Sequence, residues 1–225
     1  MKKLKKIIKS INTLYFFIYK LNCRLSNVRR KHGRLVVNGS GNYRIKKNIK
    51  GKNNVMFVGE GAFINESLIR IIGNNNKIIF EENVVVGPQC SFWIEGDGIE
   101  IRVGKNTTFT LHCHINAQEN ESRIIIGEDC MFANNIIVRT SDSHPIIDLK
   151  SGLRTNPPKD VILGKHVWVA PQAMLMKGTK IGDGSIVGAR AVLTKEYPEN
   201  SLIVGSPGKV VKSDVSWTRD RIVGC

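Results

Sequence analysis

This 225-residue chain has few aromatic residues and no long uninterrupted hydrophobic run. Aromatic side chains make up 7 % of the sequence, although hydrophobic residues make up 41 %. The apolar stretch at residues 14–18 is too short to span a bilayer, and no small-residue cleavage site follows it. We therefore expect neither a membrane-spanning helix nor a cleaved signal peptide, but one domain with a sizeable aliphatic core.

The chain has few cysteines, and their number and spacing do not suggest disulfide pairs. The five cysteines form an odd set without any CxxC spacing, which argues against a disulfide framework and favours a reducing, cytoplasmic compartment. His112 and His114 flank Cys113, but alternate residues of a strand face opposite sides and no third ligand is evident. We expect no metal site.

Acidic residues are missing from the first 59 positions, which hold eleven lysines and five arginines. The rest of the chain is nearly neutral, so this segment supplies the net charge of +15. Apolar residues at helical spacing predict a basic amphipathic helical arm over residues 1–34. Such an arm suits an anionic membrane surface; packing on the protein or another subunit, or binding an acidic polymer, are alternatives. No recognition motif for nucleic acid accompanies the charge.

A strict six-residue period is the strongest positive signal. It fits neither an α-helix nor a simple alternating strand. It predicts an all-β fold, a triangular coil of short parallel strands with one bulky residue pointing inward per side, over residues 35–197. Asn/Gly clusters such as residues 73–76 predict the left-handed corners of the coil, and Cys90, Cys113 and Cys130 fall at small inward-facing positions. The unbroken register consists of Leu163, Val169, Leu175, Ile181, Val187 and Leu193.

The period is interrupted between Val138 and Leu163, which predicts a loop inserted at residues 139–161. Loops that project from a rigid scaffold commonly carry function. His144 lies in this loop directly before a proline, and imidazole suits proton removal near neutral pH. Residues 198–225 are expected to form a short, partly helical tail that caps the open end of the coil, with Trp217 packed there.

Four segments carry a resemblance to a known family: SDSHP at 141–145, LGKHVWVA at 163–170, IGDGSIVGA at 181–189 and YPENSLIVGSPGKV at 197–210. Together they resemble the bacterial hexapeptide-repeat acyltransferases with a left-handed parallel β-helix, most of all those that acetylate sugars and surface polysaccharides. The resemblance implies a homotrimer that transfers acetyl from acetyl-CoA to a hydroxyl in a ternary complex.

The same resemblance implies roles for individual residues. His144 matches the catalytic base, Asp142 is a candidate to orient it, and Trp168 offers an indole N–H to the thioester oxygen or simply packs on the coil. Asn116 and Asn134 are expected at coil corners, as acceptor-binding or merely structural residues. The positions that match coenzyme A contacts are Ala170, Gly188, Ala189, Thr194, Lys195, Lys209 and Lys212.

Two departures from the family pattern matter. Ser206, Pro207 and Gly208 replace the usual Asn-Pro-Ala, and Pro171 removes a backbone donor.

The expected function is O-acetylation of a bacterial capsular or O-antigen polysaccharide or its sugar precursor, in the cytoplasm or at the inner face of its membrane. Alternatives are a small soluble acceptor, such as a free sugar, nucleotide amino sugar or antibiotic, and a catalytically silent scaffold.

Overall fold

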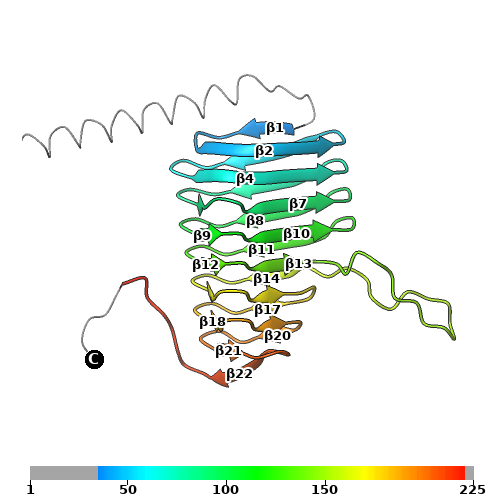
Figure 1. Cartoon of the computed structure of the whole chain (residues 1–225), viewed down its shortest axis with the longest axis vertical. Coiled ribbons are helices and arrows are strands. Elements are labelled where there is room, and N and C mark those ends of the chain that lie inside the picture. Colours follow the sequence, from blue (N-terminus) through cyan, green and yellow to red (C-terminus); the bar gives the residue numbers. More distant parts are fainter. Residues whose placement is uncertain (1–34, 221–225) are drawn as a thin grey trace, which may run out of the picture.

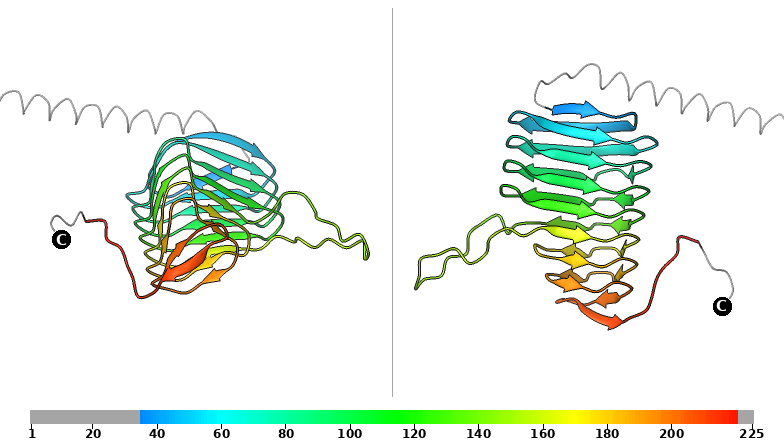
Figure 2. Two further views of the ribbon diagram at one scale, coloured as in Figure 1. Left: turned by 60° about the horizontal axis from the view of Figure 1, so that its bottom comes forward. Right: turned by 180° about the vertical axis from the view of Figure 1, so that it is seen from behind.

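A computed structural model describes residues 35–220 (Figure 1). The expected helical arm at residues 1–34 lies outside the described residues. The described part consists of strands stacked into a tall three-sided prism, with one long arm leaving its side (Figures 1 and 2). Between residues 35 and 220 there is no helix that could cross a bilayer.

The strands fall on three faces of the prism, named here A, B and C. Face A is an eight-stranded sheet. A fourteen-stranded sheet folds around faces B and C, because β2 (Asn42–Lys50) and β4 (Phe63–Ile72) run across both.

The remaining strands are short. Face A holds β1 (Leu35–Asn38), β3 (Asn54–Val58), β5 (Lys77–Phe80), β8 (Glu100–Val103), β11 (Arg123–Ile126), β14 (Val161–Leu163), β17 (Lys180–Ile181) and β20 (Glu196–Tyr197). Face B holds β6 (Val85–Val86), β9 (Thr108–Leu111), β12 (Met131–Asn134), β15 (Trp168–Val169), β18 (Ile186–Val187) and β21 (Leu202–Val204). Face C holds β7 (Ser91–Glu95), β10 (His114–Gln118), β13 (Ile137–Arg139), β16 (Met174–Leu175) and β19 (Val192–Leu193).

From β1 to β21, every pairing is parallel and joins strands of successive coils. Leu163 pairs with Ile181, and Val169 with Val187, so residues of the six-residue register stack directly on one another. All six register residues are buried, with at most 3 % of any of them exposed. The parallel β-helix expected from the period is confirmed.

The interior is filled by aliphatic residues and by one aromatic stack. Phe80, Phe92, Phe109 and Phe132 follow one another along the axis, with ring centroids 4.5–5.9 Å apart. The three inward cysteines predicted from spacing are buried. Burial raises the pKa of the Cys130 thiol to about 12, which keeps it protonated and unreactive.

The corners require left-handed backbone at many positions. At the predicted corner of residues 73–76, Gly73 has φ 135° and Asn75 has φ 58°. A Cβ on Gly73 would lie 1.9 Å from the carbonyl oxygen of Gly96, so only glycine fits where successive corners meet.

The C-terminal tail differs from expectation. No residue from 198 to 220 is helical; instead β22 (Lys209–Lys212) pairs antiparallel with β21 and occupies the open strand edge. After β22 the chain turns back along the side of the prism (Figure 2). Trp217 stacks on His166 with ring centroids 4.2 Å apart, so it packs on the side of the coil and not over its end.

Candidate active site

The arm leaves the prism at the corner between faces C and A. It starts after β13 and returns at β14, and its far end is closed by a bridge between Ile147 and Arg154. Its root is narrow, because the amide of Lys159 donates to the carbonyl of Thr140 at 3.0 Å. The coil therefore continues directly beyond the arm, and β11 pairs with β14 without a gap in register.

Asn156 joins the two sides of the arm at its root. Its Nδ2 donates to Asp142 Oδ2 at 2.8 Å and to the carbonyl oxygen of His144 at 2.9 Å. Its Oδ1 accepts from the amide of Ile146 at 2.6 Å and from Arg154 Nε at 3.2 Å. Asn156 is buried, and these four bonds use its full capacity. The backbone around the exposed His144 is thereby held in place.

Asp142 is bound by Lys177, whose Nζ lies 2.6 Å from Asp142 Oδ2. The bond from Lys177, followed by that from Asn156, holds the pKa of Asp142 below its ordinary value. Within residues 35–220, no hydrogen bond joins the Asp142 carboxylate to the imidazole of His144. Asp142 therefore reaches His144 only through Asn156, which is a different arrangement from direct orientation of the ring.

A second ion pair joins the arm to the coil. Arg154 donates from Nη2 to Glu119 Oε1 at 2.8 Å, and Ser141 Oγ donates to the same oxygen. The bond from Arg154 holds the pKa of Glu119 below its ordinary value. The arm is thus anchored to the coil on both sides of His144.

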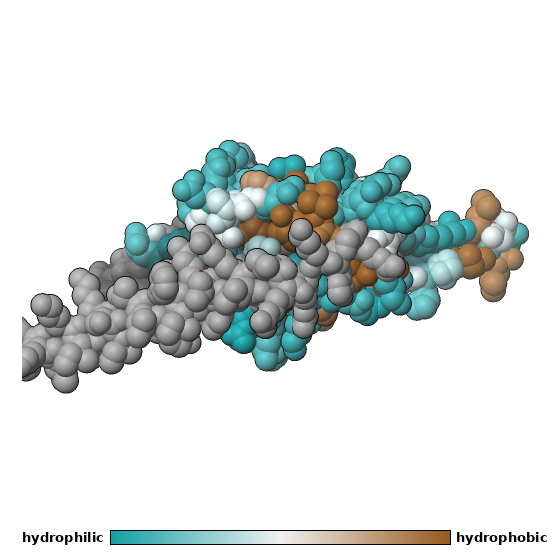
Figure 3. Space-filling view, turned by 90° about the horizontal axis from the view of Figure 1, so that it is seen from above, coloured by the Kyte–Doolittle hydropathy of each residue, from teal (hydrophilic) through white to brown (hydrophobic). Residues whose placement is uncertain are grey.

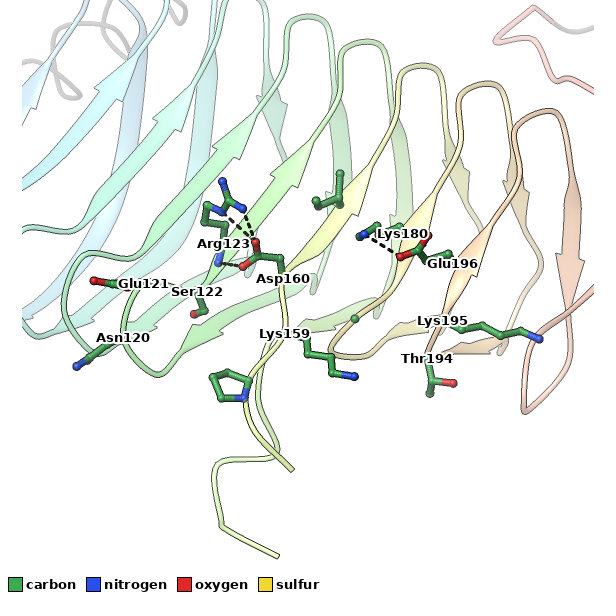
Figure 4. Close-up of a pocket in the computed structure, with 13 residues that line it drawn as sticks. Asn120, Glu121, Ser122, Arg123, Lys159, Asp160, Lys180, Thr194, Lys195 and Glu196 are labelled. Carbon is green, nitrogen blue, oxygen red and sulfur yellow. Dashed lines mark hydrogen bonds and ion pairs between the residues drawn. The ribbon is translucent and has the colours of Figure 1, made fainter. Parts of the chain in front are cut away.

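A pocket of about 690 Å³ opens beside the root of the arm, on face A (Figure 4). Arg123 is paired with Asp160, and Lys180 with Glu196. In the described part of the chain, Lys159 has no ion pair. Thr194, Lys159 and Lys195 line the same wall (Figure 4). Glu121 also lines the pocket, so its four cationic and three acidic side chains leave one positive charge in excess for an anionic ligand.

Lys195 is the other uncompensated cation of the pocket. It forms no ion pair with any carboxylate of residues 35–220, and its Nζ lies 5.9 Å from the centroid of the Tyr197 ring. Thr194 and Lys195, both matched to the cofactor by resemblance, thus lie at the corner that also carries the root of the arm.

The other expected cofactor residues lie elsewhere. Ala170 and Gly188 occupy the corner between faces B and C, and their amides donate to Val187 and Ile203 at 2.9 and 2.8 Å. Their N–H groups are therefore already bonded within the coil, and a pantetheine arm could pair there only with their carbonyl oxygens. Ala189 is exposed beside them.

Lys209 and Lys212 are exposed on β22. The strand lies at the C-terminal end of the prism, beyond the corner that carries Thr194 and Lys195. The expected cofactor positions are therefore spread over two corners and a terminal strand of one chain.

Trp168 lies on face B, half-buried, between Met131 and Ile186 of the neighbouring strands. Its ring centroid is 6.2 Å from that of Trp217 in the tail. His144 lies at the corner of faces C and A. One subunit thus places the two expected catalytic side chains on different sides of the prism.

The two candidate acceptor residues are placed differently from expectation. Asn116 is not at a corner: it lies inside β10 on the outer surface of face C, and its Oδ1 is buried without a partner. Asn134 ends β12, and the left-handed corner residue is its neighbour Asn135.

Asn156 and Lys177 were not identified from the sequence. The only available signal was the run Asn-Pro-Pro at 156–158, since an asparagine before two prolines is restricted to extended backbone. In the described range, no group of three or more histidine, cysteine, aspartate or glutamate residues could hold a metal ion.

Comparison with known proteins agrees with this architecture. Residues 160–195 match the family model described as bacterial transferase hexapeptide (six repeats). The chain is 36 % identical to the polysialic acid O-acetyltransferase of Neisseria meningitidis, over 75 % of this chain and 77 % of that protein. It is 32 % identical to the polysialic acid O-acetyltransferase of Escherichia coli O1:K1 / APEC, over 56 % of this chain; this match spans less than half of that relative, 42 %.

Among solved structures, the polySia-specific acetyltransferase NeuO superposes with a TM-score of 0.69 at 27 % identity, over 85 % of this chain and 91 % of that chain. This likeness extends the sequence matches to nearly the whole prism and confirms its left-handed form. The chain belongs to the bacterial hexapeptide-repeat transferases, within their O-acetyltransferase branch.

Proposed function

We propose that this protein transfers the acetyl group of acetyl-CoA to a hydroxyl of a bacterial capsular or O-antigen polysaccharide, or of its sugar precursor. The observation that carries the proposal is the root of the arm. There, Asn156 and the Asp142–Lys177 pair hold the backbone of His144. Lys159, which closes the same root through its amide, lines the pocket together with Lys195. The names of the relatives support the acetyl group and the polysaccharide class.

The chemistry assigned to His144 is general-base catalysis. The imidazole takes the proton of the attacking hydroxyl as its oxygen bonds to the thioester carbonyl carbon. The tetrahedral intermediate then collapses, the carbon–sulfur bond breaks, and the proton passes from the imidazolium to the leaving thiolate of coenzyme A. The intermediate carries its negative charge on the former carbonyl oxygen, which needs an N–H donor, and the Trp168 indole is our candidate for that role.

A homotrimer is part of the proposal, because one subunit keeps His144 and Trp168 apart. The arm exposes Ile147, Leu149 and Leu153, of which Leu149 is 97 % exposed. Hydrophobic surface is visible at the end of the arm that projects from the prism (Figure 3). Apolar side chains grouped at the end of an extended arm support this part of the proposal, because a neighbouring subunit would cover them. Such a neighbour can bring its own face B, with Trp168, toward the His144 of the first subunit.

The basic residues of segment 1–34 give a further part of the proposal. Their charge and apolar spacing suit peripheral binding at the anionic inner face of the cytoplasmic membrane, where surface polymers are assembled. Flotation of the full chain and of a chain lacking residues 1–30 with anionic liposomes tests it. Equal recovery of the two would reject the membrane role.

His144→Ala tests the catalytic assignment. We expect acetyl transfer to polysialic acid to fall by about 10²- to 10⁴-fold, the usual contribution of a general base. His112→Asn is the matched control, since His112 lies outside the arm and asparagine tolerates its left-handed backbone, with φ 53°. Light scattering should give the same oligomeric mass for all three proteins, and a His144→Ala enzyme with full activity would refute the assigned base. Faster turnover of free sialic acid than of the polymer would favour a small soluble acceptor.

A further inference from the structure

Four side chains on the outer surface of face C form one column across successive coils. Arg70 is in register with Trp93, Trp93 with Asn116, and Asn116 with Arg139. Paired strands lie about 4.8 Å apart, so the column is about 14 Å long. We refer to these four residues as the face C column.

Every member of the face C column has a buried polar atom without a hydrogen-bond partner: Nε of Arg70 and of Arg139, Nε1 of Trp93, and Oδ1 of Asn116. No other buried side-chain nitrogen or oxygen in residues 35–220 lacks a partner. An unpaired buried donor or acceptor costs about 1–3 kcal/mol. Concentration of all four in one column indicates a site that is completed by something outside the chain.

The chemistry of the column points to an acidic ligand. Three of the four atoms are donors, and neither arginine forms an ion pair with a carboxylate in the described part of the chain. The Arg70 guanidinium lies 4.5 Å from the centroid of the Trp93 ring, which leaves the edge of the indole for hydrogen bonding. All four residues are half-buried, so part of each side chain is open to a ligand on the outer surface of face C. Guanidinium groups bind carboxylates with two parallel bonds.

The column also ends at the candidate active site. Arg139 Nη2 donates to Ser143 Oγ at 2.7 Å, and Ser143 immediately precedes His144. A linear polymer lying on the column would therefore lead from the upper coils to the imidazole. We infer that the face C column binds an acidic polysaccharide chain along the coil axis and delivers it to His144. This inference rests on the proposed function and adds the binding site and the charge of its substrate.

A second copy of this chain is the other possible occupant of the column. Arg70 and Arg139 lie at the two ends of the column and form no ion pair within residues 35–220, which favours a ligand with more than one negative charge. A contact between subunits would leave both guanidinium groups in need of acidic partners from the neighbour. The oligomeric state of variants in the face C column distinguishes a polysaccharide ligand from a second subunit as the occupant.

Affinity electrophoresis of the full chain in gels that contain polysialic acid, with dextran gels as the neutral reference, tests the inference without any acetyl donor. Arg70→Gln and Arg139→Gln should each weaken retardation by polysialic acid about tenfold or more, because each removes a bond to a charged group. Arg102→Gln removes an equal charge from face A and should stay within about twofold of the unchanged protein.

Asn116→Asp provides a signature that a folding defect cannot imitate. The new carboxylate would accept a bond from Arg139 in the next coil, which satisfies a buried donor and should leave the melting temperature unchanged or raised. The same charge would repel the ligand, so affinity for polysialic acid should fall at least tenfold. Stability and binding thus move in opposite directions.

Two results would overturn the inference. One is retardation of Arg70→Gln and Arg139→Gln equal to that of Arg102→Gln. The other is a reduced oligomeric mass in light scattering with polymer binding retained, which would assign the column to a contact between subunits. Because no acetyl transfer is measured, an inactive enzyme that still binds polysialic acid through the column would contradict the proposed function alone.

Discussion

Replacement of Asn156 by aspartate should displace His144 while the coil remains intact. The two side chains have the same shape, and aspartate keeps the bonds accepted from Ile146 and Arg154. Its second oxygen, however, would face the carboxylate of Asp142 and the carbonyl oxygen of His144. Two donated hydrogen bonds become two repulsive contacts at the root of the arm, where Asn156 joins its two sides.

The size of the effect follows from the two lost bonds. A hydrogen bond to a charged group contributes about 1.5–3 kcal/mol and a neutral one about 0.5–1.5 kcal/mol, so about 2–4 kcal/mol of positioning is removed. If this loss is felt fully in the transition state, kcat falls about 30- to 1000-fold. KM for acetyl-CoA should change little, because Lys159 and Lys195 of the pocket keep their surroundings.

The assay is release of the coenzyme A thiol with polysialic acid as acceptor, measured for Asn156→Asp, Asn156→Ala and the unchanged protein over a range of pH. As the pH falls, the new carboxyl group gains a proton and can donate one bond again. The rate of Asn156→Asp relative to the unchanged protein should therefore rise toward acid pH, whereas that of Asn156→Ala should not. A kcat within twofold of the unchanged protein, or parallel pH profiles for the two variants, would refute the positioning role.

Three further predictions concern stability. Phe109→Ala removes the ring between two others of the aromatic stack and should cost about 3–5 kcal/mol, a loss of about 6–20 °C in the melting temperature by calorimetry. Trp217→Ala removes the stack on His166 and the bond from Nε1 to its carbonyl, about 2 kcal/mol, so trypsin should cleave the tail about 30-fold faster while the coil melts unchanged. Lys177→Met removes the partner that lowers the pKa of Asp142. A lowered carboxyl pKa stabilises the fold above the ordinary aspartate range and loses this effect as pH falls through the lowered value, so the melting temperatures of Lys177→Met and the unchanged protein should converge in acid; a constant difference would contradict this.

The sequence was sufficient to predict the coil because each coil repeats the same physical requirement. Leu163, Val169 and Leu175 each point inward from a different side of the prism. The strand one coil away needs an apolar residue at the paired position for the same reason. The same regularity placed Cys113 inside and the arm immediately after Val138. A period is a local property of the chain, so it can be recognised in the sequence without knowledge of the tertiary contacts.

The site could be predicted only in part, because its contacts join distant positions. Asn156 meets Asp142 across 14 residues, and Lys177 meets it from the following coil. The tail was misjudged for a related reason: Lys209–Lys212 adopts a strand because β21 offers an unpaired edge, which overrides local preference. Asn116 was taken for a corner residue, since asparagine is common in left-handed turns, although here it lies within a strand.

The position of the candidate site follows from the one place where the coil is interrupted. A regular prism offers side chains on its outer faces only at fixed spacing, which suits binding but not the close convergence that catalysis needs. The arm supplies that convergence: its narrow root, closed by the bond between Lys159 and Thr140, returns Asn156 to the neighbourhood of His144. The same narrow root lets β14 pair with β11 in register, so the parallel pairing of the coil continues past the inserted arm. In the arrangement proposed here, the regular faces hold the polymer and the irregular corner performs the reaction, and each task falls to the part of the fold whose geometry permits it.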